Sequence, residues 1–192
     1  VPSFEESIIA PISTKILEVY AQNGDSLEEG TPLLRLDLQN AESEYAKMLD
    51  EREIRRQQLA QLKINNTTRA SERKMQIEIA KMRLARLEAE LHNEQYLDSL
   101  GSGTADRVRQ AQISLETSRL ELEQQELQSV NEEASMEAEV RMQELQLKIF
   151  EKGLEEKMRT LRDAEIRSPR KAILTYIDNE IGATVGIGTK VA

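Results

Sequence analysis

The sequence predicts an α+β fold: a long antiparallel α-helical coiled-coil hairpin inserted into a small β sandwich that both chain ends form. Three observations predict it, namely a short motif that occurs twice, a helix-forming segment between the copies, and a Gly-containing break halfway along that segment. We expect the first half of the β domain at residues 7–36. We expect the hairpin at 37–165, with its tip near 101–104, and the second half of the β domain at 166–192.

The repeated motif covers residues 11–33 and 169–191. Equivalent residues at this fixed spacing are Pro11 and Pro169, Ile16 and Leu174, Val19 and Ile177, Leu27 and Val185, and Leu33 and Val191. The glycines also match, and we expect each to form a structural turn: Gly24 with Gly182, and Gly30 with Gly188. One copy is too small to cover its own apolar face, so we expect the two copies to pack together.

The segment between the copies has the composition of long helices, rich in Glu, Gln, Leu, Arg, Ala and Lys and without Pro. Asp37 is a plausible N-cap, Gly101 suits a helix C′ position, and Thr104 suits the next N-cap. The break leaves two arms of about 60 residues, each able to extend roughly 90 Å. Asn65-Asn66 is a weak helical stretch. The equal arms favour a local irregularity there, and a true break stays open.

Apolar residues in both arms follow a heptad-like spacing, which favours a coiled coil. The outgoing arm has one such series: Ile77, Ala80, Leu84, Leu87 and Leu91. The return arm has two: Val108, Leu115 and Leu122, and also Ile113, Leu120, Leu127 and Ala134. The two series lie roughly 200° apart around the helix. One can meet the partner arm. The other either meets a neighbouring protomer or flanks a single broad apolar face.

Composition limits the possible functions. The net charge of −9 argues against a nucleic-acid binder, which needs a basic face. An aromatic content of 3 % argues against one large globular core. The chain has no Cys, no apolar run of the roughly 20 residues that span a bilayer, and no signal-peptide pattern. Because it begins at Val1 without Met, we expect a piece of a longer protein.

No catalytic or metal-binding pattern is evident, so we predict a protein that is not an enzyme and needs no cofactor. His92 is the only histidine, and with Glu88 it supplies two ligands, too few for a structural zinc site. The adjacent carboxylates Glu132-Glu133 and Glu155-Glu156 point about 100° apart on a helix, so they form no acid/base dyad.

The two motif copies resemble the halves of a lipoyl/biotinyl-type domain. The first half is carried by Ala10-Pro11, Ile16, Val19, Gly24-Asp25, Gly30-Thr31 and Leu33, and the second by Ser168-Pro169, Ile173, Gly182, Val185, Gly188-Thr189 and Val191. In carrier domains a tight hairpin with a modified lysine joins the halves. Here the helical insert takes that position, and Lys171 lies near a strand start.

A lipoyl-like domain split by an α-hairpin resembles the periplasmic adaptor, or membrane fusion, proteins of haemolysin-D-type secretion and of efflux systems. The resemblance covers essentially the whole chain. It implies a non-catalytic adaptor that links an inner-membrane transporter to an outer-membrane channel, for export of protein or small molecules. It also implies a homo-oligomer in the periplasm, with the parent protein anchored in the inner membrane of a Gram-negative bacterium. A lipoyl/biotinyl-type carrier domain and a structural coiled-coil tether are the alternatives.

The resemblance also suggests a docking site at the hairpin tip. Many family members carry an Arg, a Leu four residues later and a Ser seven residues after that, all contacting the channel. Here the residues at this spacing are Asn93, Leu97 and Thr104, and Asn lacks the cation of Arg. Apolar residues at the end of a charged hairpin also suggest docking, and packing against Val108 is the alternative. The predicted partner-binding residues are Asn93, Tyr96, Leu97, Leu100, Gly101 and Thr104.

Overall fold

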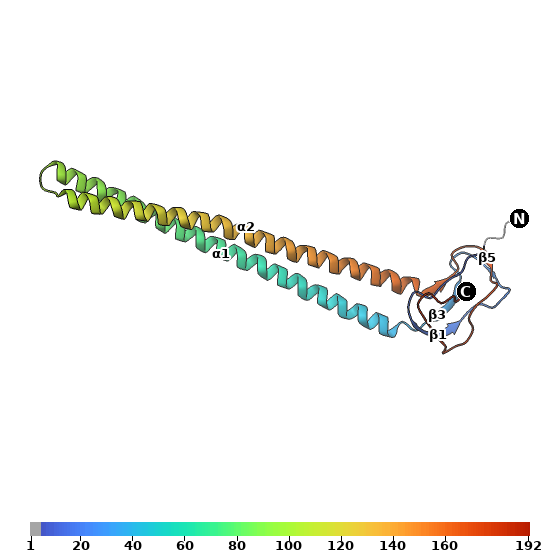
Figure 1. The fold of residues 1–192 in the computed structure, drawn as a ribbon. Helices are drawn as coiled ribbons and strands as arrows, with labels where there is room; N and C mark the ends of the chain where they lie inside the picture. Colours follow the sequence, from blue (N-terminus) through green and yellow to red (C-terminus); the bar gives the residue numbers. More distant parts are fainter. Residues whose placement is uncertain (1–4) are drawn as a thin grey trace. The chain divides into compact units, whose positions relative to one another are not determined.

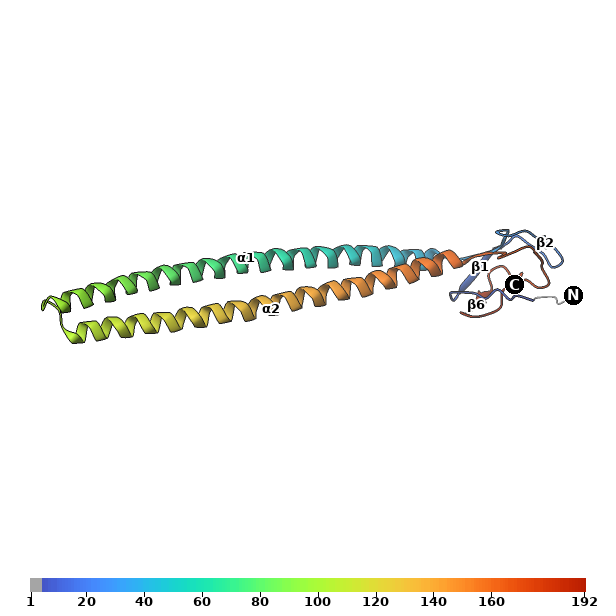
Figure 2. The ribbon, with the colours of Figure 1, turned by 90° about the horizontal axis from the view of Figure 1, so that it is seen from above.

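The computed structural model describes residues 5–192, so the expectation about the chain start at Val1 lies outside the described residues. The chain divides into two compact units, Val1–Arg55 with Leu147–Ala192 and Arg56–Gln146, and each is described by itself. Two helices, α1 (Gln39–Ser99, 61 residues) and α2 (Ala105–Asp163, 59 residues), run antiparallel and side by side (Figures 1 and 2). Among the described residues, neither helix is apolar enough over a sufficient length to cross a membrane.

The β domain contains residues from both chain ends, as the repeat predicts. Its strands are β1 (Thr14–Val19), β2 (Ser26–Leu27), β3 (Pro32–Leu36), β4 (Glu165–Arg167), β5 (Ala172–Ile173) and β6 (Thr184–Val185). They form a curled four-stranded sheet in the order β4-β3-β1-β6 and a two-stranded sheet of β2 and β5. All four strand pairs are antiparallel, and three of them join the two chain ends.

The two halves are related by an approximate internal twofold symmetry that matches the sequence repeat. Thr14 faces Val185 between β1 and β6. The repeat equivalents of these residues, Ala172 and Leu27, face each other between β5 and β2. Equivalent residues therefore make equivalent pairings, each with the opposite half of the domain.

Backbone hydrogen bonds at the glycine turns repeat the same symmetry. The Gly182 N–H donates to the Ile16 carbonyl at 2.8 Å, and the equivalent Gly24 N–H donates to the Leu174 carbonyl at 2.7 Å. Gly24 and Gly182 have φ values of 99° and 85°, in a region of backbone conformation that residues with a side chain rarely adopt. Each half therefore holds the turn of the other half in place.

One apolar core joins the halves. Ile16, Leu33 and Val191 are completely buried in it, and Ile177 belongs to the same cluster. Val19 packs against this cluster from the first half. A core built from residues 158 positions apart confirms that the chain ends fold together around the base of the hairpin.

The second half contains less regular strand than its sequence suggests. The apolar run 173–177 predicts a strand, but β5 ends at Ile173. The equivalent residues of β1 continue as strand because β3 pairs with them. Residues 174–177 have no such ladder partner among the described residues, although Leu174 and Ile177 are buried.

Helix α1 is continuous through Asn65-Asn66, so the alternative of a true break is wrong. The hydroxyl groups that follow donate to carbonyls one turn earlier: Thr67 to Lys63 at 2.9 Å and Thr68 to Ile64 at 3.1 Å. Such bonds satisfy the hydroxyl group without ending the helix, although they often bend it slightly.

Ion pairs between the arms fix their relative position in the distal unit. Lys63 pairs with Glu144 at 2.7 Å, and Lys81 pairs with Glu126 at 3.4 Å. The two pairs are 18 residues apart on both helices, so the antiparallel register is the same at both positions. Nearer the base, Lys157 pairs with Glu44 at 2.6 Å.

Candidate docking site at the hairpin tip

The tip is a tight turn whose backbone groups are largely satisfied internally. The N–H of Gly101 donates to the Asp98 carbonyl at 2.9 Å, and the N–H of Ser102 donates to the Leu97 carbonyl at 3.0 Å. With Gly101 at a φ of 72°, this is the Schellman arrangement that ends many helices. The end of α1 therefore has one defined conformation.

Gly103 is required by the close approach of the chain to itself. A Cβ atom at this position would lie 2.6 Å from the backbone nitrogen of Asp98, a distance that real Cβ atoms do not show. The Gly103 N–H also donates to the Leu97 carbonyl at 3.0 Å. The second glycine of the tip thus allows the turn to fold back over the last turn of α1.

Thr104 begins the return helix. Its side-chain Oγ1 accepts a hydrogen bond from the Arg107 N–H at 3.3 Å, and its carbonyl accepts from the same N–H at 3.0 Å. The Thr104 hydroxyl oxygen therefore contacts the first turn of α2, as an N-cap side chain does. Any contact of this oxygen with a partner would be additional to that role.

The structure separates the predicted apolar tip residues into two groups. The side chains of Tyr96 and Leu100 are 60 % and 59 % exposed. Leu97 is half-buried, as is Val108 at the start of α2. Asn93 is exposed one turn before Tyr96. The surface available to a partner is therefore formed mainly by Asn93, Tyr96 and Leu100.

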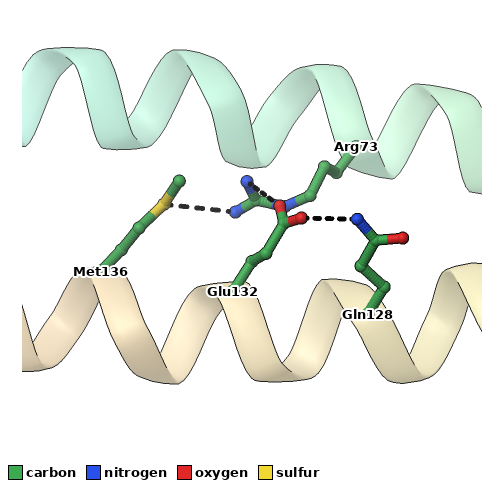
Figure 3. Close-up of polar contacts among 4 residues, drawn as sticks. All are labelled: Arg73, Gln128, Glu132 and Met136. Atoms are coloured by element: carbon green, nitrogen blue, oxygen red, sulfur yellow. Dashed lines mark hydrogen bonds and ion pairs between the residues drawn. The ribbon is translucent and has the colours of Figure 1, made fainter.

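A polar layer lies within the seam, the surface along which α1 and α2 face each other, and it was not anticipated from the sequence (Figure 3). The Arg73 side chain, only 15 % exposed, pairs through Nη1 with Glu132 Oε2 at 3.0 Å. Its Nη2 donates to Met136 Sδ at 3.4 Å, while Gln128 Nε2 donates to the other Glu132 oxygen at 2.8 Å. One sequence signal could have found this layer, because Arg73 continues the apolar series one turn before Ile77.

The remaining candidate residues form no chemical site in the described part of the chain. No group of three or more His, Asp or Glu side chains there could hold a metal ion. His92 and Glu88 are both exposed. The Lys171 ammonium, the position relevant to a carrier role, pairs with Glu28 at 2.7 Å on the surface of the β domain.

No family model and no curated protein matches the chain. Similar solved structures exist at low sequence identity. The periplasmic adaptor protein EmrA has a TM-score of 0.45 and 15 % identity, with 97 % of this chain and 70 % of that chain covered. The soluble domain of LipC, a membrane fusion protein of a type I secretion system, has a TM-score of 0.45 and 15 % identity, covering 94 % and 95 %.

A third similar structure is the membrane fusion protein Spr0693 from Streptococcus pneumoniae R6. Its TM-score is 0.28 and its identity is 12 %, with 93 % of this chain and 54 % of that chain covered. All three TM-scores are below 0.5, so the proposed function rests on the sequence and geometry of this chain.

Proposed function

We propose that this chain is the adaptor part of a bacterial export system, linking an inner-membrane transporter to an outer-membrane channel without catalysing a reaction. The observation that carries the proposal is the fold itself. Two helices of 61 and 59 residues leave and return to one β domain formed by both chain ends. In such a fold the hairpin tip is a small surface of defined conformation, and about 60 residues of helix separate it in sequence from each half of the β domain.

The tip supports a docking role because its conformation is fixed while its apolar side chains face solvent. The Schellman turn and the close packing at Gly103 hold the backbone. The aromatic ring of Tyr96 and the aliphatic side chain of Leu100 are exposed, and the backbone hydrogen bonds of the turn do not involve these side chains. Pre-organised, partly apolar surfaces bind with a smaller entropy cost than flexible ones. We therefore assign the channel contact to this end of the hairpin.

The parent protein would work in the periplasm of a Gram-negative bacterium, with its anchor in the inner membrane. Contacts with the transporter would be made largely by parts of the parent protein outside residues 1–192. Copies of the chain would assemble side by side around the export path.

Photocrosslinking in the native bacterium tests the proposal. A photoreactive amino acid replaces Tyr96 in the full-length protein, and the crosslinked product is identified by mass spectrometry. We expect a product with an outer-membrane channel protein. The matched control places the same amino acid at Lys74, an exposed position of α1 that lies many helical turns before the tip. The crosslink to the channel is not expected there. Crosslinks from position 96 only to proteins outside the cell envelope would contradict the proposal.

An export assay gives a second test. Replacing both Tyr96 and Leu100 with Asp puts two charges on the proposed contact surface without touching the turn glycines. Export through the system is expected to fall at least about tenfold, as for loss of a hydrophobic contact worth 1.4 kcal/mol or more. The helix content measured by circular dichroism is expected to stay unchanged. Full export by this variant would rule out the tip as the docking site.

The carrier alternative predicts a covalent mass increase after expression with a lipoyl or biotinyl ligase. The tether alternative predicts that deleting 38–164 and joining the flanks leaves a disordered peptide, whereas the adaptor fold predicts a folded β domain.

A further inference from the structure

The charge of helix α1 reverses between its middle and the hairpin tip. Residues 63–86 contain seven Lys or Arg and two Glu. Residues 88–106, which form the end of α1, the turn and the start of α2, contain five Asp or Glu and no Lys or Arg. The end of the hairpin that carries the exposed Tyr96 and Leu100 is therefore acidic. A partner surface of opposite charge would be attracted to it.

The carboxylates near the end of α1 lie along one face of the helix. Glu90, Glu94 and Asp98 follow one another at intervals of four residues, so their side chains are neighbours. Like charges at this spacing destabilise a helix. In the described part of the chain none of the three forms an ion pair, whereas Glu88 pairs with Arg119 at 3.8 Å. The repulsion among them is therefore not relieved within the chain.

Asp98 also lies at the unfavourable end of its helix. It is in the last turn of α1, where the helix dipole is negative and where the chain has no basic residue. Asp106, in contrast, is in the first turn of α2, where the dipole favours an acidic side chain. Helix stability thus accounts for Asp106 and does not account for Asp98.

Glu94 has a carboxylate oxygen that the chain leaves without a partner. The residue is half-buried, between the seam positions of Leu91 and Leu97. Its Oε2 atom is buried and forms no hydrogen bond with the described residues. A buried carboxylate oxygen is normally paired, because removing it from water without a compensating bond is costly. Since the residue as a whole stays partly exposed, a donor at the surface can reach this carboxylate.

The chemistry of the tip selects one kind of ligand. No group of acidic side chains in the described residues could hold a metal ion, so a divalent cation does not fit. Nucleic acids and anionic lipid surfaces carry negative charge and would be repelled. A protein surface with Arg or Lys beside apolar residues fits both the carboxylates and the exposed Tyr96 and Leu100. Arg fits best, because its guanidinium can donate two hydrogen bonds to one carboxylate.

We propose that the hairpin tip docks onto a basic surface, and that Arg or Lys side chains of the partner pair with Glu94 and Asp98. The inference rests on the proposed adaptor function, which makes that partner the outer-membrane channel. It adds the sign of the charge that the channel presents at the contact. The unfavourable charges at the end of α1 are neutralised in the complex, where they contribute to affinity and to the choice of partner.

Removing these charges should change stability and docking in opposite directions. The variant Glu94→Gln/Asp98→Asn keeps the size of both side chains and removes both charges. Thermal unfolding followed by circular dichroism is expected to show a midpoint about 2 °C higher, because repulsion between carboxylates and with the helix dipole is lost. The matched control Glu88→Gln breaks the pair with Arg119, and it is not expected to raise the midpoint. A lower midpoint for the double variant would show that the carboxylates serve the fold, and would overturn the proposal.

Docking is measured with the same substitutions in the full-length protein that carries the photoreactive amino acid at position 96. The yield of the channel crosslink is expected to fall about tenfold in the double variant and to stay unchanged in Glu88→Gln. In washed cell envelopes, added salt is expected to weaken the crosslink of the protein that keeps both carboxylates. Salt is expected to have little further effect on the double variant. An unchanged crosslink yield in the double variant would overturn the proposal.

This experiment separates the two proposals. If position 96 gives no channel crosslink in the protein that keeps both carboxylates, the adaptor function fails and the basic partner surface fails with it. If that protein and the double variant crosslink equally well to the channel, the adaptor function stands and only the charge inference is refuted. A crosslink that is lost in Glu88→Gln as well would indicate a general effect of charge along α1, which contradicts a specific role of Glu94 and Asp98.

Discussion

The β domain and the distal part of the hairpin are stabilised by different interactions. In the β domain, Ile16, Leu33 and Val191 are completely buried. In α1, by contrast, no residue is buried, and the seam contains an Arg–Glu pair. Burial of apolar area is the largest favourable term in folding, whereas exposed ion pairs contribute little. The β domain therefore has its own core, whereas the arms depend more on partial burial of apolar side chains between the two helices.

Truncating one leucine in the β domain and one in the hairpin should give the largest difference in the free energy of unfolding. Leu33→Ala is expected to cost about 2–5 kcal/mol in the free energy of unfolding of the β domain, because it removes a fully buried side chain. Leu84→Ala, in the half-buried seam of α1, is expected to cost clearly less. Urea denaturation of both variants at low protein concentration measures the two values. Equal losses would show that the seam is as well packed as the β core.

Two glycines, one at the tip and one inside α2, offer a second contrast. Gly103→Ala pushes a methyl group against the backbone of Asp98, and overpacking of this kind costs about 1–3 kcal/mol. Gly153 lies inside α2 with open space around its Cβ position. Gly153→Ala is therefore expected to stabilise the helix by about 0.5–1 kcal/mol. Thermal unfolding followed by circular dichroism should show shifts of opposite sign, and a stabilising Gly103→Ala would refute the tip geometry.

The repeat shows how far sequence alone can define a fold. Gly24 and Gly182, with the apolar residues at fixed distances from them, predict that the chain ends share one domain. The twofold pairing of Thr14 with Val185 and of Ala172 with Leu27 confirms this. The prediction succeeds because turn and pattern signals are local, and because two copies of them must satisfy each other.

The return arm shows where such reasoning stops. The series containing Leu122 and the series containing Leu120 are equally apolar, so spacing alone cannot say which one faces α1. The structure places Leu122 in the seam, where it is 9 % exposed, and leaves Leu120 57 % exposed. Arg73 was missed for a related reason: a charged residue normally indicates a solvated face, and only its position before Ile77 suggests the seam. The docking roles of Asn93, Tyr96 and Leu100 stay predictions, because exposure shows availability and not the identity of a partner.

The Arg73 layer provides the third test. Its side chain is 15 % exposed and that of Glu132 is 40 % exposed, so solvent screens the pair only partly. Arg73→Leu is expected to cost about 1 kcal/mol, the typical value of a lost hydrogen-bonded contact. The double variant Arg73→Leu/Glu132→Leu is expected to recover most of that loss, since apolar pairs often replace partly buried ion pairs without cost.

A double-mutant cycle in urea measures the coupling between these two residues. The control pair, Arg109 with Asp106, is 72 % and 91 % exposed, and its removal is expected to change stability by less than about 0.5 kcal/mol. Additive losses at Arg73 and Glu132 would show that the layer contributes no specific interaction.

The smallest expected effect is a pH dependence near the helix base. The hydrogen bond and charge of Lys157 hold the pKa of Glu44 below its ordinary value of 4.5. A carboxyl group whose pKa is lower in the folded state stabilises that state above the unfolded pKa, and this contribution is lost as the pH falls through the folded pKa. The stability difference between the parent chain and Glu44→Gln is therefore expected to be constant from neutral pH to about 4.5. It should then decline at lower pH.

The partner of Glu44 decides whether this interpretation is correct. In a Lys157→Met background, Glu44→Gln is expected to change stability with a much smaller decline below pH 4.5, because the main group that lowers the pKa is absent and only the weaker effect of the Lys47 charge remains. Chemical denaturation at several pH values measures all four chains of this cycle. If the pH dependence persists at full size without Lys157, the ion pair at 2.6 Å is not what stabilises the charged form of Glu44.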